Sequence, residues 1–231
     1  MKPIQAKRTL SRLVNNTKRP VFFWGPPGVG KSAIVKQVAQ ESDMQMCDVR
    51  AVLLDPVDLR GLPHINGANK AHWSIPSFLP TEGRGVLFLD ELAQAPPLVQ
   101  SACLQLTLDR CIGEYTLPDD WVVVAASNRT EDRAGAHQVI TPLLNRMIHI
   151  DLEVSNDDWK TWALDNHLNP SVISFLDFRP DLLHDFTPES NQRSFPSPRS
   201  WEFVSDVMSF TDKSDQHQVI SGCVGAGAAT E

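Results

Sequence analysis

The chain has 231 residues, of which 42% are hydrophobic and 21% charged, a composition typical of a globular protein with enough apolar residues for a core. Its longest apolar run, Trp121 to Ala126, is far shorter than the roughly 20 residues that a membrane span requires, so we expect no membrane insertion. No apolar stretch precedes Val21, so we expect no signal peptide and a cytoplasmic location. The four cysteines lack CxxC spacing, which predicts reduced thiols rather than disulfides or a metal site.

The charge of the chain is unevenly distributed. Lys and Arg number 21 and Asp and Glu 28, which gives a net charge of −7 and argues against a protein that coats nucleic acid. Residues 1–40 nevertheless contain eight Lys and Arg and no acid. This basic end is either a solvated helix or an electropositive face that receives a polyanion.

The first forty residues predict a helix, a strand and a second helix. Apolar residues spaced among the basic ones predict an amphipathic helix, and Pro20 limits its length. The continuous apolar run Val21–Trp24 is typical of a strand buried on both faces. Glycines follow, and residues Ser32–Gln40 then show helical periodicity.

The middle of the chain alternates strands and helices. Apolar runs predict further strands at Met44–Leu54, Val86–Leu89, Trp121–Ala126 and Met147–Leu152. A helix is predicted between two of them, at Leu98–Leu108. Alternation of this kind predicts the α/β class, with a parallel sheet covered on both faces.

Two segments interrupt this alternation and predict inserted hairpins, at Ile65–Trp73 and Cys111–Leu117. The first contains Asn66-Gly67, which favours a tight turn. Trp73 is either an exposed anchor for another protein or packs under its apolar neighbours Ile75 and Phe78.

The last third of the chain predicts helices alone, at Asp157–Leu164, Pro170–Phe178 and Trp201–Phe210. We therefore predict two domains, an α/β core at 1–153 and a small helical lid at 154–231. The chain ends in what resembles the start of a helix, an ending that fits a truncated lid.

A phosphate-binding motif follows the first strand. Residues 25–32 fit the pattern GxxxxGK[ST], and the strand before them and the helix after them are the context that this motif requires. Backbone N–H groups of the loop would cradle the phosphates, Lys31 would reach the outer phosphates, and the Ser32 hydroxyl would be a ligand of Mg²⁺. The predicted nucleotide-binding residues are Gly25, Pro26, Pro27, Gly28, Val29, Gly30, Lys31 and Ser32.

Two adjacent acids, Asp90 and Glu91, end the strand that begins at Val86. Because successive strand residues point to opposite sides, the two acids at the edge of the sheet can have different roles. We expect Asp90 to face Mg²⁺ and Glu91 to act as the general base for an attacking water.

The order of GPPGVGKS, VLFLDE and Ala125-Ala-Ser-Asn128 resembles the AAA+ ATPases. The segment that starts at Glu91, and the later Gly113–Pro118, resemble the MoxR-like branch of that family. The resemblance implies an AAA+ αβα domain with a helical lid, ATP and Mg²⁺ as cofactors, a hexameric ring, and a von Willebrand factor A domain protein as client. Ala93-Gln94 departs from the Asn-Arg pair expected there.

The resemblance also implies roles for four polar side chains. Asn128 would be sensor 1, an amide that holds the attacking water or the γ-phosphate. Arg146 would be the arginine finger given to a neighbouring subunit, with Arg133 as a second candidate. Arg199 would be sensor 2, in the first turn of a helix that begins near Pro198.

These observations favour Mg²⁺-dependent ATP hydrolysis in a ring that remodels or activates a partner protein. Two alternatives stay open, a DNA-handling motor or loader and a nucleotide-binding switch with little turnover. The basic N-terminus partly supports the DNA alternative, although we do not expect a nucleic-acid partner. Glu91 argues against the switch. The seven histidines show no HxxxH or HxH spacing and predict no zinc site.

Overall fold

The computed structural model describes residues 1–65, 67, 69–132, 139–190 and 192–231. By their contacts these residues divide into two compact units. One, the sheet unit, contains residues 6–25 and 31–151, and the other, the helical unit, contains residues 1–5, 26–30 and 152–231. Each unit is described by itself below. The proposed domains at 1–153 and 154–231 stay a prediction.

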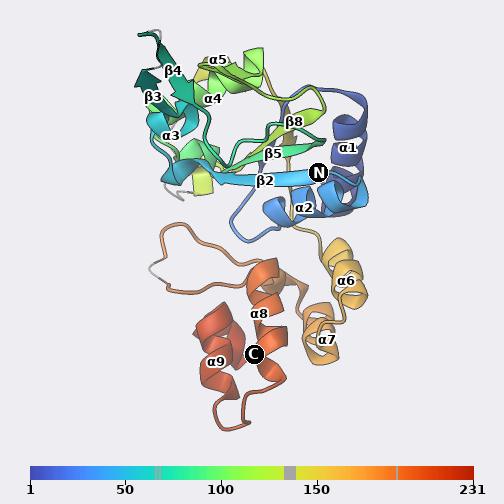
Figure 1. The fold of residues 1–231 in the computed structure, drawn as a ribbon. Coiled ribbons are helices and arrows are strands. Elements are labelled where there is room, and N and C mark those ends of the chain that lie inside the picture. Colours follow the sequence, from blue (N-terminus) through green and yellow to red (C-terminus); the bar gives the residue numbers. More distant parts are fainter. Residues whose placement is uncertain (66, 68, 133–138, 191) are drawn as a thin grey trace. The chain divides into compact units, whose positions relative to one another are not determined.

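The sheet unit is built on five parallel strands in the order β2-β5-β8-β1-β9 (Figure 1), which confirms the predicted α/β class. The second predicted strand is shorter than expected, because the chain leaves β2 for a 3₁₀ turn at Ala51–Leu53. Since β2 is an edge strand, it pairs only with β5, and only its Val49 is buried. The strands are β1 (Val21–Trp24), β2 (Gln45–Arg50), β5 (Gly85–Asp90), β8 (Trp121–Ser127) and β9 (Ile148–Asp151).

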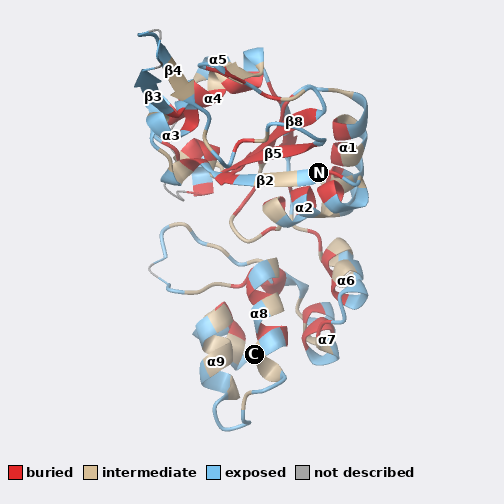
Figure 2. Cartoon of the chain, in the orientation of Figure 1, coloured by how far each residue is buried: buried red, intermediate tan, exposed pale blue. Residues whose placement is uncertain are grey.

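Helices cover both faces of this sheet, with α1 and α2 on one side and α4 and α5 on the other (Figure 1). β5 and β8 are buried along their whole length (Figure 2), so the centre of the sheet is the core of the unit. Ala6, Leu10 and Val14 are buried at a spacing of four residues, which confirms the predicted amphipathic helix. The helices of this unit are α1 (Pro3–Asn16), α2 (Lys31–Glu41), α3 (Pro56–Arg60), α4 (Pro97–Asp109) and α5 (Thr141–Leu144).

Both predicted hairpins are present. The first pairs β3 (Leu62–Ile65) with β4 (Ala71–Ser74), and the second pairs β6 (Cys111–Ile112) with β7 (Tyr115–Thr116). Ile65 pairs with Ala71, and the tight turn expected at Asn66-Gly67 falls between these two residues. Asn66 itself lies outside the described residues. Trp73 is half-buried, and its role toward a client stays a prediction.

The helical unit contains the three predicted helices and two more. Trp159, Trp201 and ten smaller apolar side chains form its core. The third predicted helix begins at Pro198, where the Arg199 argument places its start, and Ser197 caps it in a reciprocal capping box with Ser200. The helices are α6 (Asn156–Asp165), α7 (Pro170–Phe178), α8 (Pro198–Met208), α9 (Gln216–Val224) and α10 (Ala226–Thr230). Among the described residues, no helix combines the length and the apolar character needed to cross a bilayer.

The cysteines are free thiols, and one of them gives a test of the packing around β2. The Cys47 Sγ donates to the Phe78 carbonyl at 2.9 Å. Burial, together with the Asp48 carboxylate, raises the pKa of the Cys47 thiol from 9.0 to about 11.

Because the thiolate is the reactive form, we expect iodoacetamide to label Cys47 about 100-fold more slowly at pH 8 than an unperturbed thiol. The rate should keep rising with pH up to about 11. Mass spectrometry of timed samples measures this rate, with urea-unfolded protein as the control. Equal labelling rates for Cys47 in folded and unfolded protein at pH 8 would contradict the expected burial.

Candidate functional site

Lys31 begins α2, directly after the glycine loop that leaves β1. Its side chain is only 9% exposed. The Nζ donates to the Gly25 carbonyl and to Asn128 Oδ1, each at 2.8 Å. A buried ammonium group needs such oxygen partners, and the two bonds fix its direction at the carboxyl end of the sheet.

Ser32 and Asp90 form the second contact of the site. The Ser32 Oγ donates to Asp90 Oδ2 at 2.7 Å, and the Glu91 backbone N–H donates to Asp90 Oδ1 at 3.0 Å. Both carboxylate oxygens are therefore fixed, and Asp90 is 8% exposed. A hydroxyl and a carboxylate are hard oxygen ligands, and Mg²⁺ typically binds one or two carboxylates together with substrate phosphates. The donor set therefore fits Mg²⁺.

Glu91 has an unusual backbone. It follows the last residue of β5 and has a φ of 57° and a ψ of 34°, in the left-handed region. A residue with a Cβ is disfavoured there by roughly 1–2 kcal/mol. This conformation turns the chain from β5 into the 3₁₀ segment Leu92–Gln94. The direction of the strand therefore changes at Glu91, the residue next to Asp90.

The order of the strands explains why these residues meet. β8 lies between β5 and β1, and all three run parallel. Their carboxyl ends therefore share one edge, where ligands bind in open α/β sheets. Asp90 ends β5, Asn128 follows β8, and Lys31 follows the loop after β1. The sheet unit thus gathers the predicted residues Lys31, Ser32, Asp90, Glu91 and Asn128.

The rest of the glycine loop, residues 26–30, belongs to the helical unit. Gly28 has a φ of +77°, and a Cβ there would lie 2.6 Å from the Ser197 Oγ, so both the backbone and the space require glycine. The Arg199 backbone N–H donates to the Gly28 carbonyl at 3.3 Å. Within this unit, the first turn of α8 therefore contacts the loop at Gly28, and the role of the Arg199 side chain stays a prediction.

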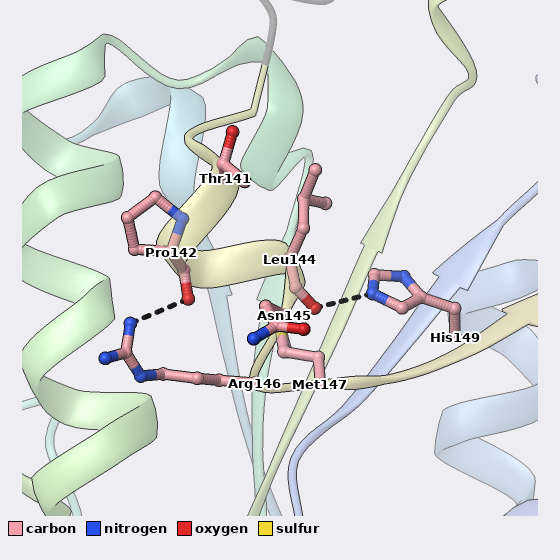
Figure 3. A pocket seen from close by; sticks show the side chains of 7 residues that line it. All are labelled: Thr141, Pro142, Leu144, Asn145, Arg146, Met147 and His149. Atoms are coloured by element: carbon pink, nitrogen blue, oxygen red, sulfur yellow. Dashed lines mark hydrogen bonds between the residues drawn. The ribbon is translucent and has the colours of Figure 1, made fainter.

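Arg146 lies apart from these residues, just after α5. It lines an open hollow of about 720 Å³ whose seven lining residues include none of the five gathered at the sheet edge (Figure 3). Its Nη1 donates to the Pro142 carbonyl at 2.8 Å, and the residue is exposed. The second finger candidate, Arg133, lies outside the described residues.

The unusual Ala93-Gln94 pair joins β5 to β8. The Ala93 backbone N–H donates to Ser127 Oγ at 2.7 Å, and that hydroxyl donates to Gln94 Oε1 at 3.2 Å. Ala93 is buried where the resemblance predicts the longer, polar Asn. Among the described residues, the Gln94 Nε2 is one of few buried side-chain atoms without a hydrogen-bond partner. No sequence signal identifies Ser127 as the acceptor.

Here a strand, a glycine loop and a helix are followed by an acid at the end of β5, two strands away in the sheet, and this acid accepts from Ser32. Such an arrangement defines a P-loop nucleotide-binding protein. Residues 21–153, more than half of the chain, match the family described as "ATPase family associated with various cellular activities (AAA)". The chain belongs to the AAA family.

Individual relatives are distant. The chain is 29% identical over 161 residues to human ATPase family gene 2 protein homolog B, a match that covers 66% of this chain and 19% of that protein. The chain therefore spans about a fifth of that relative's length.

Two solved structures show the same fold. NtrX from Brucella abortus in complex with ATP is 14% identical with a TM-score of 0.57, over 98% of this chain and 52% of that one. A variant of RuvB from Thermotoga maritima is 18% identical with a TM-score of 0.58, over 98% of this chain and 67% of that one. At such low identities these likenesses show the AAA+ fold alone.

Proposed function

We propose that this AAA protein hydrolyses ATP with Mg²⁺ and uses the cycle to remodel or activate a partner protein. The observation that carries the proposal is the meeting of Lys31, Ser32, Asp90 and Asn128 at one sheet edge. Phosphoryl transfer depends on positioning the reacting groups and on neutralising the charge of the phosphates. A basic, a hydroxyl, an acidic and an amide group at one place can do both.

Each residue has a part in this proposal. The loop from Gly25 to Gly30 binds the phosphates through its backbone N–H groups, except at Pro26 and Pro27, which have none. Lys31 neutralises the outer phosphates, and Ser32 and Asp90 hold Mg²⁺. When bound, the metal ion supplies charge neutralisation on the phosphate oxygens. Glu91 accepts the proton of the attacking water, and Asn128 orients that water.

The proposal includes a hexameric ring. Arg146, which is exposed beside an open hollow, is proposed as the finger that completes the site of the next subunit. Arg133 is the second candidate for that role, and Arg199 is proposed as sensor 2. We further propose a MoxR-like protein whose client is a von Willebrand factor A domain protein, contacted through the β3–β4 hairpin with Trp73. The two inserted hairpins and the resemblance described above support this part.

Phosphate release from ATP by the purified chain tests the proposal. We expect release that depends on Mg²⁺ and stops on addition of EDTA, at protein concentrations where light scattering detects rings. ATP binding without release under those conditions would contradict the proposal and favour the nucleotide switch.

A parallel titration of duplex DNA between about 50 and 200 mM salt tests the remaining alternative. Arg8 and Arg12 are exposed on α1 and could contact DNA phosphates in a DNA-handling motor. Phosphate contacts of that kind lose affinity steeply with salt. Tight, salt-sensitive DNA binding with DNA-stimulated phosphate release would favour the motor.

A further inference from the structure

His149 joins two parts of the sheet unit through both of its ring nitrogens. The Trp24 Nε1–H donates to His149 Nδ1 at 2.8 Å, and His149 Nε2 lies 2.7 Å from the Leu144 carbonyl (Figure 3). An indole N–H can only donate and a carbonyl can only accept, so Nδ1 accepts and Nε2 carries the proton. The two contacts together select one neutral tautomer of this side chain.

Strand pairing brings these groups together. β9 pairs with β1 in parallel register, with His149 opposite Phe22. Side chains two residues apart on a strand share a face, so Phe22, Trp24 and His149 lie on the same side of the sheet. Their rings stack, with 4.0 Å between the centroids of Phe22 and Trp24 and 6.1 Å between those of Trp24 and His149. The stack holds the imidazole flat against the end of β1.

The two partners of His149 are close in sequence to two different features, the glycine loop and Arg146. Trp24 ends β1 and directly precedes Gly25, whose carbonyl accepts from Lys31 Nζ. Leu144 ends α5 and lies two residues before Arg146. A continuous series of contacts therefore runs from the phosphate-binding lysine, through Trp24 and His149, to the turn that carries Arg146.

α5 has four residues, and an isolated helix that short is not stable in water. Its Leu143 is buried in the core of the sheet unit and anchors the turn from one side. Arg146 is exposed, and the hydrogen bond that its side chain makes among the described residues is local, to the Pro142 carbonyl within the same turn. His149 is exposed as well and is not part of the core, so its contacts contribute little to folding. Its contact with the Leu144 carbonyl instead ties the end of α5 to β9, on the side that leads to Arg146.

We propose that His149 is a positioning residue for Arg146, and that it holds the α5 turn to the end of β1 so that the guanidinium is presented at a fixed place. The inference rests on the proposed trans role of Arg146. In this inference His149 acts in the subunit that donates Arg146, and not in the neighbouring subunit that binds the nucleotide.

Mixed rings test this assignment. A Lys31→Ala subunit still supplies Arg146, and an Arg146→Ala subunit still binds ATP, so the mixture should recover activity. His149→Phe, which keeps a ring in the stack and removes both hydrogen bonds, is then added to one subunit or to the other. Both mixtures contain the same three substitutions and differ only in where His149→Phe lies.

On the Lys31→Ala subunit, His149→Phe should lower the recovered activity at least about fivefold, the value of one lost hydrogen bond at the transition state. On the Arg146→Ala subunit it should change the recovered activity less than twofold. Equal activity in both mixtures, or equal loss in both, would overturn the inference. If the mixture of Lys31→Ala and Arg146→Ala subunits with unchanged His149 recovers no activity, the trans role of Arg146 is contradicted. The inference about His149 then fails as well.

Two conservative variants separate the two hydrogen bonds. Gln at position 149 can place a donor near Nε2 and keep the bond to Leu144, whereas Asn can place an acceptor near Nδ1 and keep the bond to Trp24. We expect His149→Gln on the Lys31→Ala subunit to retain most of the recovered activity and His149→Asn to lose it. The reverse order would overturn the role of the Leu144 contact.

The indole N–H resonance of Trp24 gives a readout that does not depend on activity. Trp24→Phe identifies the resonance in a ¹⁵N spectrum. It should shift in His149→Phe and stay near its original position in His149→Asn. An unchanged Trp24 resonance in His149→Phe would show that the contact between the two rings is absent in solution, and would overturn the inference.

Discussion

Replacing Glu91 with glutamine should leave ATP binding nearly unchanged and lower ATP hydrolysis about 10²- to 10⁴-fold, the usual contribution of a general base. The amide has almost the shape of the carboxylate and accepts a proton far less readily. The side chain of Glu91 does not hold Asp90, because the contact comes from the Glu91 backbone N–H. The proposed metal ligand should therefore keep its position in Glu91→Gln.

Single-turnover phosphate release and ATP titration measure the two effects separately. Lys31→Ala is the contrasting variant and should lose ATP binding, since it removes the buried ammonium group that faces Gly25 and Asn128. Glu41→Gln removes the same charge at the far end of α2 and should match the parent protein. A Glu91→Gln protein that hydrolyses ATP at the parent rate would show that another group is the base.

Arg146→Ala should keep ATP binding and lower hydrolysis about 10³-fold or more, as expected for an arginine that neutralises charge in phosphoryl transfer. The loss should appear in the rate and not in the affinity, because Arg146 lies outside the group of residues that includes Lys31 and Asp90. Arg146→Lys keeps the charge without the planar fork and should recover little.

Mixing Arg146→Ala with Lys31→Ala subunits is the decisive measurement for the trans role. Each subunit then supplies what the other lacks, and activity should rise well above that of either variant alone. Arg12→Ala, which removes an exposed arginine from α1, is the matched control and should hydrolyse ATP like the parent. Mixed rings detected by mass spectrometry that stay inactive would place the missing function of Arg146 within its own subunit.

Much of the fold and of the phosphate site could be predicted because the signals are local. The apolar run of β5 ends in Asp90 within a few residues of sequence, and the pattern from Gly25 to Ser32 fixes a strand, a loop and a helix together. Once parallel strands are predicted, the shared edge that brings Asp90 and Asn128 together follows from topology. The structure places both where that argument requires.

What escaped prediction depends on contacts between distant segments or on very short elements. Nothing in the sequence shows that β9, the last strand, lies beside β1, so the contact of Trp24 with His149 was not predicted. The absence of paired histidine spacing led to no role for His149 at all. α5, with four residues, is too short to show a helical period.

The left-handed backbone at Glu91 makes the residue that is best for folding stability different from the residue proposed for ATP hydrolysis. Glycine adopts that conformation without the penalty of a Cβ, so Glu91→Gly relieves strain worth roughly 1–2 kcal/mol while it removes the carboxylate. A stability-only selection of random variants would therefore favour loss of the acid, whereas selection for turnover would retain it. On the proposed role of Glu91, thermal measurements alone would count as a defect a residue that turnover requires.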